Sequence, residues 1–401
     1  MKLPDPQVKF ALMCRLACTL KCMVLGLMLS ACSTVPPLPV AAVSALLHDE
    51  AYPLAVVPAD RDTVFDFSPA MRAYADTQLA AVARLRDPRQ ALLDALYRED
   101  KLRLRYDAGP TRNAAQAFDA KAGNCLSLVI LTAAFARHLG VPVSYQSVQV
   151  DDTYSRSGGL VLISHHVNLV LGRRLSHAAY SGGQSDDMTV DFLRSEELRG
   201  QRTQPLAEHT VLAMYFNNRA AEALADGQTS ETYAWTREAL RQDPAYLPAI
   251  NTLAVAYMHD QHLNEAEAAL RHVLTQEPRS PSTLSNLALL LERRGQMAEA
   301  QEVRQRLARL QPEMPFALFE QGQRALANGD YVMARDLFLR ELRRQPDQPD
   351  VLFGAALAEW QLGDSQRAAG HLQEALANSH SPRARDLYAG KLAWLRDQPR
   401  P

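Results

Sequence analysis

The sequence has no apolar run at its N-terminus long enough to form a membrane-spanning helix. The run there covers residues 22–29, whereas a helix that crosses the bilayer core needs about 20 residues. The mean hydropathy of -0.22 excludes a protein with several membrane spans. The net charge of -2 gives no electrostatic reason to expect nucleic acid as the partner.

Motifs for cofactors and metals are also missing. The sequence has no phosphate-binding glycine loop, no dinucleotide fingerprint and no cluster of cysteine, histidine and carboxylate residues that suggests zinc. We therefore expect no cofactor and no metal. With 47% hydrophobic and 22% charged residues, the composition is that of a globular protein, and 401 residues predict two or three domains.

The N-terminal segment has the pattern of a secretory signal. Lys21 precedes the short apolar run, and small residues follow it. The junction Leu29-Ser30-Ala31-Cys32 resembles the lipobox of bacterial lipoproteins, which implies that Cys32 is lipidated and becomes the first residue of the mature chain. The alternative is an ordinary signal followed by a chance cysteine. The start of translation stays open between Met1 and Met13.

Cysteine is scarce beyond that signal. Of the five cysteines, only Cys32 and Cys125 lie outside residues 1–31, so a lipidated Cys32 excludes a disulfide framework within one chain. Residue 33 is serine. In lipoproteins an aspartate there marks retention at the inner membrane, so the resemblance implies an outer-membrane lipoprotein that faces the periplasm.

Four segments are expected along the chain. They are a signal peptide over 1–31, a proline-rich tether over 32–45, an α+β domain over 46–205 and an all-α domain over 208–401. In the α+β domain, apolar spacing predicts helices over 70–104 with a break at Pro88. A stretch that is apolar nearly all round predicts a buried helix ended by Gly140. Strands are predicted at 142–150, 159–172 and 188–192.

Residues 208–401 show a period of 34 residues. It is marked by four prolines, Pro244, Pro278, Pro312 and Pro346. The residues 17 before each proline, continued into one further unit, are expected in a turn between paired helices: Gly227, Gln261, Gly295, Gly329 and Gly363. The pattern resembles the tetratricopeptide repeat, which implies a solenoid of about five units over 213–382 with a capping helix from Leu387.

Cys125 is the candidate nucleophile. It lies in AGNCLSL, at the expected N-terminus of the buried helix, where the helix dipole and unpaired backbone N–H groups favour a thiolate. The alternative is a small core residue, because cysteine is among the most buried residue types.

His166 and Asp191 are the candidate base and orienting carboxylate. His166 lies in a predicted strand, and an imidazole there would take the proton of the thiol and return it to a leaving amine. His165 faces the other side of that strand, because side chains alternate. Asp191 would fix the tautomer of the imidazole. Ordinary polar strand residues are the alternative, and Asp186 and Asp187 are weaker rivals to Asp191.

Residues 106–192 resemble the transglutaminase-like superfamily, which shares papain-type Cys-His-Asp chemistry. The motifs that carry the resemblance are TRNAAQAF, GNCLSLVILTAAFARHLGVPV, HHVNLVL and VDF. By matching positions, it implies a nucleophile, a base and an orienting residue at Cys125, His166 and Asp191. Two positions depart from the pattern, because Asn168 replaces a common tryptophan and Phe192 a common proline.

The oxyanion hole stays open at this point. The backbone N–H of Cys125 is the natural first donor, and Asn124 or Asn113 is a candidate second donor. Gly158 and Gly159 favour an ordinary turn over a lid.

The repeats offer a second candidate site for a protein or peptide partner. In the family, the fifth and ninth residues of each first helix face a concave groove, and the C-terminal units place large apolar residues there: Phe319, Phe353 and Leu357. Exposed aromatic surface can mark a peptide groove. The alternative is that neighbouring helices cover these side chains.

Two functions from different classes are consistent with these features. The first is a lipid-anchored, periplasm-facing cysteine hydrolase, a protease or amidase that works through an acyl-thioester and recruits its protein substrate or partner through the repeats. With an amine in place of water, the same site would be an acyl transferase. The second is a non-catalytic envelope scaffold or binding lipoprotein. Reactivity of the Cys125 thiol discriminates between them.

Overall fold

The computed structural model describes residues 43–52, 61–107, 109–157, 160–172, 187–192, 202–310, 317–344, 346–379 and 382–397. The chain divides into two compact units, Met1–Pro39 and Val40–Pro401, and all of the described residues belong to the second. The predicted signal segment 1–31, Cys32 and the prolines of the tether lie outside the described residues, as do Pro312, Asp186, Gly158 and Gly159.

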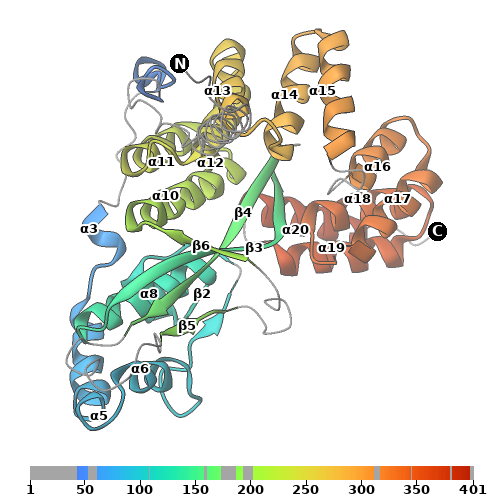
Figure 1. The fold of residues 1–401 in the computed structure, drawn as a ribbon. Helices are drawn as coiled ribbons and strands as arrows, with labels where there is room; N and C mark the ends of the chain where they lie inside the picture. The colour runs from blue at the N-terminus through green and yellow to red at the C-terminus, as the bar shows by residue number, and fades with distance from the viewer. Residues whose placement is uncertain are drawn as a thin grey trace, which may run out of the picture. The chain divides into compact units, whose positions relative to one another are not determined.

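The first part of this unit combines helices with a small sheet (Figure 1). Its helical segments are η1 (Asp49–Ala51), α3 (Arg61–Val64), α4 (Pro69–Tyr74), the π-helical η2 (Ala75–Leu79), α5 (Ala80–Leu85), α6 (Pro88–Tyr97), α7 (Ala114–Ala120) and α8 (Cys125–His138). Its strands are β1 (Arg105–Tyr106), β2 (Ala122–Gly123), β3 (Val143–Ser157), β4 (Leu160–Leu171), β5 (Met188–Val190) and β6 (Arg202–Leu206).

Four of these strands form an antiparallel sheet in the order β5-β4-β3-β6. The apolar alternation in the sequence predicts strands at the positions of β3, β4 and β5 but not at β6. In β6 most residues are exposed. Pro205 has no backbone N–H to donate to a neighbouring strand, which is tolerated at a sheet edge. An exposed edge strand shows little of the apolar alternation from which a strand is predicted.

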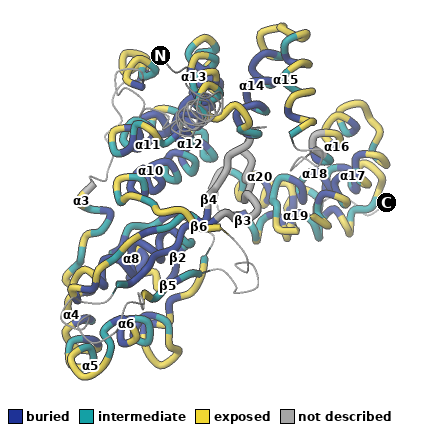
Figure 2. Tube along the Cα trace, in the orientation of Figure 1, coloured by how far each residue is buried: buried dark blue, intermediate teal, exposed yellow. Residues whose placement is uncertain are grey.

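Helix α8 lies against this sheet and forms its core (Figure 2). Every residue from 126 to 136 is buried, as a helix that is apolar nearly all round requires. The helix ends at Gly140, whose φ of 66° is left-handed. A glycine adopts that conformation without the strain that a Cβ would cause.

The second part of the unit consists of paired helices (Figure 1). They are α10 (Glu208–Ala225), α11 (Thr229–Gln242), α12 (Leu247–His259), α13 (Leu263–Gln276), α14 (Pro281–Arg293), α15 (Met297–Leu310), α16 (Ala317–Ala327), α17 (Tyr331–Arg344), α18 (Pro349–Gln361), α19 (Ser365–Asn378) and α20 (Pro382–Asp397). The predicted helical solenoid is confirmed in this region.

The predicted turn positions all have the same backbone conformation. Their φ angles run from 66° to 84°, in the left-handed region, at Gly227, Gln261, Gly295, Gly329 and Gly363. Each lies between the first and second helix of a pair. The 34-residue period therefore reflects a backbone requirement that glycine meets at four of the five turns.

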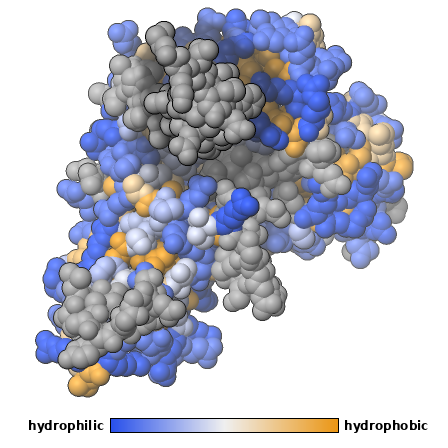
Figure 3. Space-filling model, viewed as in Figure 1, coloured by the Kyte–Doolittle hydropathy of each residue, from blue (hydrophilic) through white to orange (hydrophobic). Residues whose placement is uncertain are grey.

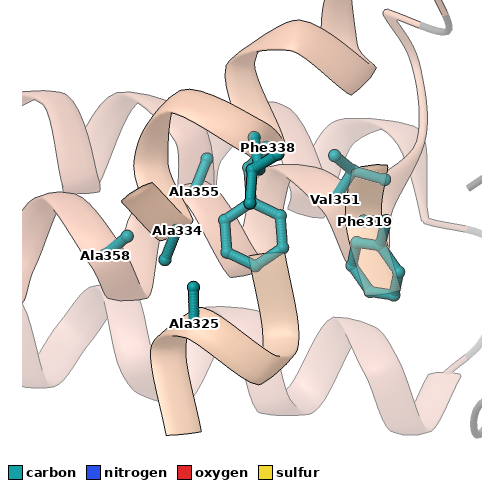
Figure 4. Packing of buried hydrophobic residues seen from close by; sticks show 8 residues of the cluster. Phe319, Ala325, Ala334, Phe338, Val351, Ala355 and Ala358 are labelled. Carbon is teal, nitrogen blue, oxygen red and sulfur yellow. The ribbon is translucent and has the colours of Figure 1, made fainter. Parts of the chain in front are cut away.

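Phe338 fills the core between α16, α17 and α18 (Figure 4). Its ring lies so close to Gly322 and Gly354 that a Cβ on either glycine would meet it at 2.7 or 2.8 Å. Phe319 is only 2% exposed and packs in the same cluster. The expectation that Phe319 offers aromatic surface to a groove is therefore wrong, because its side chain is part of the core.

The surface in view in Figure 3 is mostly hydrophilic, with hydrophobic atoms gathered in small patches. Among the described residues, none of the helices combines the length and the apolar character that crossing a bilayer requires.

Candidate active site

Cys125 is the first residue of α8. The preceding residue, Asn124, has an extended backbone and caps the helix, since its side-chain oxygen accepts the Ser127 N–H at 2.9 Å. The Cys125 thiol is free and half-buried. It therefore lies beside backbone N–H groups that have no partner within the helix, at the positive end of the helix dipole.

The short strands β1 and β2 hold this helix end in place. They pair in parallel, with Arg105 opposite Ala122 and Tyr106 opposite Gly123. A Cβ on Gly123 would meet the Cβ of Ser127 at 2.6 Å, so the strand approaches the helix closely at this glycine. In the sequence Gly-Asn-Cys, the glycine thus lets the strand approach the helix, the asparagine caps the helix, and the cysteine supplies the thiol.

His166 and Asp191 form a hydrogen-bonded pair. His166 lies in β4 and is 6% exposed, and Asp191 directly follows β5. The distance from His166 Nε2 to Asp191 Oδ1 is 2.7 Å. Strand pairing explains the approach, because β4 and β5 are antiparallel neighbours joined at Leu169 and Val190.

The pKa of His166 reflects three influences. Burial lowers it, but hydrogen bonds with Asp191 and Cys125, together with their charges, raise it to about 9. Since Nε2 faces Asp191, Nδ1 is the ring nitrogen that remains for the thiol. An imidazole with this pKa carries its second proton at neutral pH, and an imidazolium stabilises a thiolate beside it.

Asn168 belongs to the same group of side chains, a role that the sequence analysis missed. Its Nδ2 donates to Asp191 Oδ2 at 3.0 Å, and it is 3% exposed. The next step of the β4–β5 register beyond Leu169 and Val190 brings Asn168 opposite Asp191. Its spacing of two residues from His166 was the available signal, because side chains two apart on a strand share a face.

Phe192 has a structural role next to Asp191. Its ring lies 5.6 Å from the ring of Tyr97 in α6, and the Tyr97 hydroxyl shares a hydrogen bond of 2.8 Å with Thr132 in α8. The aromatic pair thus joins the segment that carries Asp191 to the helix that carries Cys125.

The candidate oxyanion donors and the rivals of His166 and Asp191 lie elsewhere or have other partners. Asn113 caps α7 and accepts the Gln116 N–H at 2.9 Å, and the Nδ2 of Asn124 donates to Thr111 Oγ1 at 2.9 Å. Both asparagines therefore serve as helix caps. Asp187 is exposed, and the side chain of His165 is outside the described part of the structure.

The predicted groove residues differ in exposure. Phe319 is in the core, while Phe353 and Leu357 are half-buried, with the Phe353 ring 5.2 Å from that of Tyr388 in α20. The strands β3 and β4 contact the first helices α10, α12 and α14 of the early repeats. Phe353 and Leu357 therefore stay predictions of partner-binding residues. Within the described ranges, no group of side chains is arranged to hold a metal ion.

Comparison with family models identifies three stretches of repeats. Residues 223–282, 283–315 and 319–382 each match a model described as tetratricopeptide repeat. The C-terminal region contains tetratricopeptide repeats. These matches begin after Asp191, so they do not include the residues of the Cys-His-Asp group. None of them shows a transglutaminase-like domain. The comparison with curated proteins found no match.

Solved structures of repeat proteins are similar to the chain. A thermophilic TPR protein of Thermus thermophilus is 18% identical, with 45% of this chain and 99% of that chain covered and a TM-score of 0.35. Pseudomonas aeruginosa pilF is 20% identical, with 48% of this chain and 87% of that chain covered and a TM-score of 0.32. YrrB, a TPR protein with an unusual peptide-binding site, is 19% identical, with 45% of this chain and 92% of that chain covered and a TM-score of 0.25.

Proposed function

We propose that this chain recruits a protein through its repeats and acts on amide or peptide bonds as a cysteine hydrolase. The observation that carries the proposal is the 2.7 Å contact between His166 and Asp191, on a ring that also interacts with Cys125. A nucleophile at a helix N-terminus, a base and an orienting carboxylate are the three parts of papain-type chemistry.

The chemistry would proceed in two halves. The thiolate of Cys125 attacks the carbonyl carbon, and the His166 imidazolium donates its proton to the leaving amine, which gives an acyl-thioester. The neutral ring then takes a proton from water, and the resulting hydroxide attacks the thioester. The carbon–sulfur bond breaks, the acid leaves, and the thiolate and the imidazolium are restored. Throughout, Asp191 holds the ring and stabilises its charged form. An amine in place of water would make the same centre an acyl transferase.

A non-catalytic scaffold is the second candidate function. The comparisons favour it over the hydrolase, because the matched models describe tetratricopeptide repeats and start at residue 223. Such repeats indicate a role in protein-protein interaction. In this reading the first part of the chain binds without reacting.

The rate at which iodoacetamide alkylates Cys125 distinguishes the two candidates. We expect alkylation near neutral pH in the wild-type chain and a rate lower by about tenfold or more in His166→Gln, because the charged ring that stabilises a thiolate beside it is then missing. Asp191→Asn should cost less, since an amide still holds the ring. Mass spectrometry of the peptide that contains Cys125 reports the rate. An inert thiol, or equal rates in all three chains, would favour the scaffold.

We also propose that Cys32 anchors the chain to the outer membrane, with its body in the periplasm. What supports this proposal is the sequence pattern, namely the junction Leu29-Ser30-Ala31-Cys32 and the serine at residue 33.

Fractionation of cells without detergent tests the anchor. Cys32→Ala should move the chain from the membrane fraction to the soluble periplasmic fraction, because the lipid is the proposed attachment. Ser33→Ala is the matched control and should stay with the membrane. A Cys32→Ala chain that stays there as well would contradict the anchor.

A further inference from the structure

Helix α10 begins the repeats, yet it is bonded to the α+β part near both of its ends. At its start, Glu208 pairs with Arg137 of α8. Fourteen residues later, about 21 Å along the helix axis, Glu222 contacts the chain just before α7. The second contact reaches the surroundings of Cys125.

Glu222 accepts hydrogen bonds on both carboxylate oxygens. Oε1 accepts the backbone N–H of Thr111 at 2.6 Å, and Oε2 accepts Arg219 Nη1 at 2.5 Å. Thr111 is 2% exposed. A buried N–H that loses its acceptor has no water to replace it, so this bond holds the backbone at Thr111 in place.

Thr111 continues the connection to the end of α8. Its Oγ1 accepts Asn124 Nδ2 at 2.9 Å, and Asn124 Oδ1 accepts the Ser127 hydroxyl at 2.8 Å. The Ser127 Oγ in turn accepts the Arg112 N–H at 2.8 Å. The loop at Thr111 and Arg112 and the cap of α8 therefore form one network, and Asn124 in that network directly precedes Cys125.

We propose that Glu222, in the first helix of the repeats, is a positioning residue for Cys125. It orients Thr111, Thr111 orients the amide of Asn124, and Asn124 sets the backbone from which the thiol projects toward His166. The inference rests on the proposed function, because it assigns Glu222 a task in the reaction of Cys125. It also links the first repeat helix to the active centre, although Glu222 lies 97 residues after Cys125 in the sequence.

The test measures Cys125 alkylation against pH in full-length chains, with thermal unfolding of each chain as a second readout. Glu222→Leu should slow alkylation at pH 7 by about tenfold, because the thiol would no longer be held beside His166. Glu222→Gln should keep most of the rate, since its amide oxygen still accepts the Thr111 N–H. Thr111→Val keeps the backbone bond but removes the acceptor for Asn124, and should slow alkylation in the same way.

The matched control is Glu208→Leu, which removes the pairing with Arg137 between the same helix and the α+β part, away from Cys125. It should lower thermal stability without changing the alkylation profile. If Glu222→Leu and Thr111→Val alkylate like the wild type while His166→Gln is slow, the positioning role is wrong and the proposed function stands. If His166→Gln also alkylates like the wild type, the proposed function itself fails. Loss of reactivity in Glu208→Leu equal to that in Glu222→Leu would reduce Glu222 to a structural contact.

Discussion

Asp191 uses its two carboxylate oxygens for two different partners. Oδ1 faces His166 at 2.7 Å and Oδ2 faces Asn168 at 3.0 Å. A carboxylate that is fixed from both sides has less freedom to turn away from the ring. We therefore expect Asn168 to favour the charged form of His166 through the orientation of Asp191, without a bond to the ring.

Replacement of Asn168 tests this contribution. Asn168→Ala should lower the pKa of His166 from about 9 toward its ordinary value, because the Asp191 hydrogen bond is one of the causes that raise it. Alkylation of Cys125 at pH 7 should then fall by roughly three- to tenfold. Val170→Ala, also buried in β4, is the control and should lower stability alone. Equal alkylation rates in the two variants would mean that Asn168 only packs.

For single residues, the sequence predicted which side chains belong to the candidate site better than it predicted their contacts. His166 and Asp191 were singled out by their chemistry and by a family resemblance, and the structure brings them together. The role of Asn168 depends on the register between β4 and β5. That register could not be predicted from the sequence of the two strands and the residues between them. Phe319 was misjudged because its position in the repeat did not indicate that it packs beside Phe338.

Among the structural elements, the turns of the repeats are the most sharply determined by sequence. Four of the five turn positions are glycine, and the fifth is Gln261, which has a φ of 66° and an exposed side chain. A residue with a Cβ is strained in this region by about 1 kcal/mol, which glycine avoids at some cost in chain entropy.

Gln261→Gly should therefore stabilise the chain by roughly 0.5 kcal/mol. Gly295→Ala is the converse change, since its φ is 72° and a Cβ there would meet nothing within 4 Å; it should destabilise by about 1 kcal/mol through backbone strain alone. Chemical denaturation of both variants and the wild type measures the two shifts. A lower stability for Gln261→Gly would show that its side chain, rather than its backbone, matters.

At the scale of the whole molecule, the sequence predicted the repeats but not the long-range contacts that join them to the first part of the chain. The 34-residue period indicated the helical array because each unit meets the same packing requirement. The bond between Thr111 and Glu222 joins residues 111 apart, and no period or local pattern marks it. The segment before η1 is a similar case, because its contact with Tyr257 crosses 211 residues.

The pKa of His166 also links the active centre to the stability of the fold. Because it is raised in the folded state from 6.5 to about 9, its contribution to stability is fully present below about pH 6.5. That contribution is lost as the pH rises through about 9. The charged ring, its carboxylate and the thiol are thus expected to form one electrostatic unit across the neutral range.

The most direct test of this account is an NMR titration of the histidine ring signals, in which the His166 signal is identified by its absence from His166→Gln. The account predicts a midpoint near pH 9 in the wild-type chain. In Asp191→Asn this midpoint should fall clearly, because burial lowers the pKa of His166 and the Asp191 charge that raises it is then missing. A wild-type midpoint at or below 6.5, or one that Asp191→Asn leaves unchanged, would contradict the claim that Cys125, His166 and Asp191 act together.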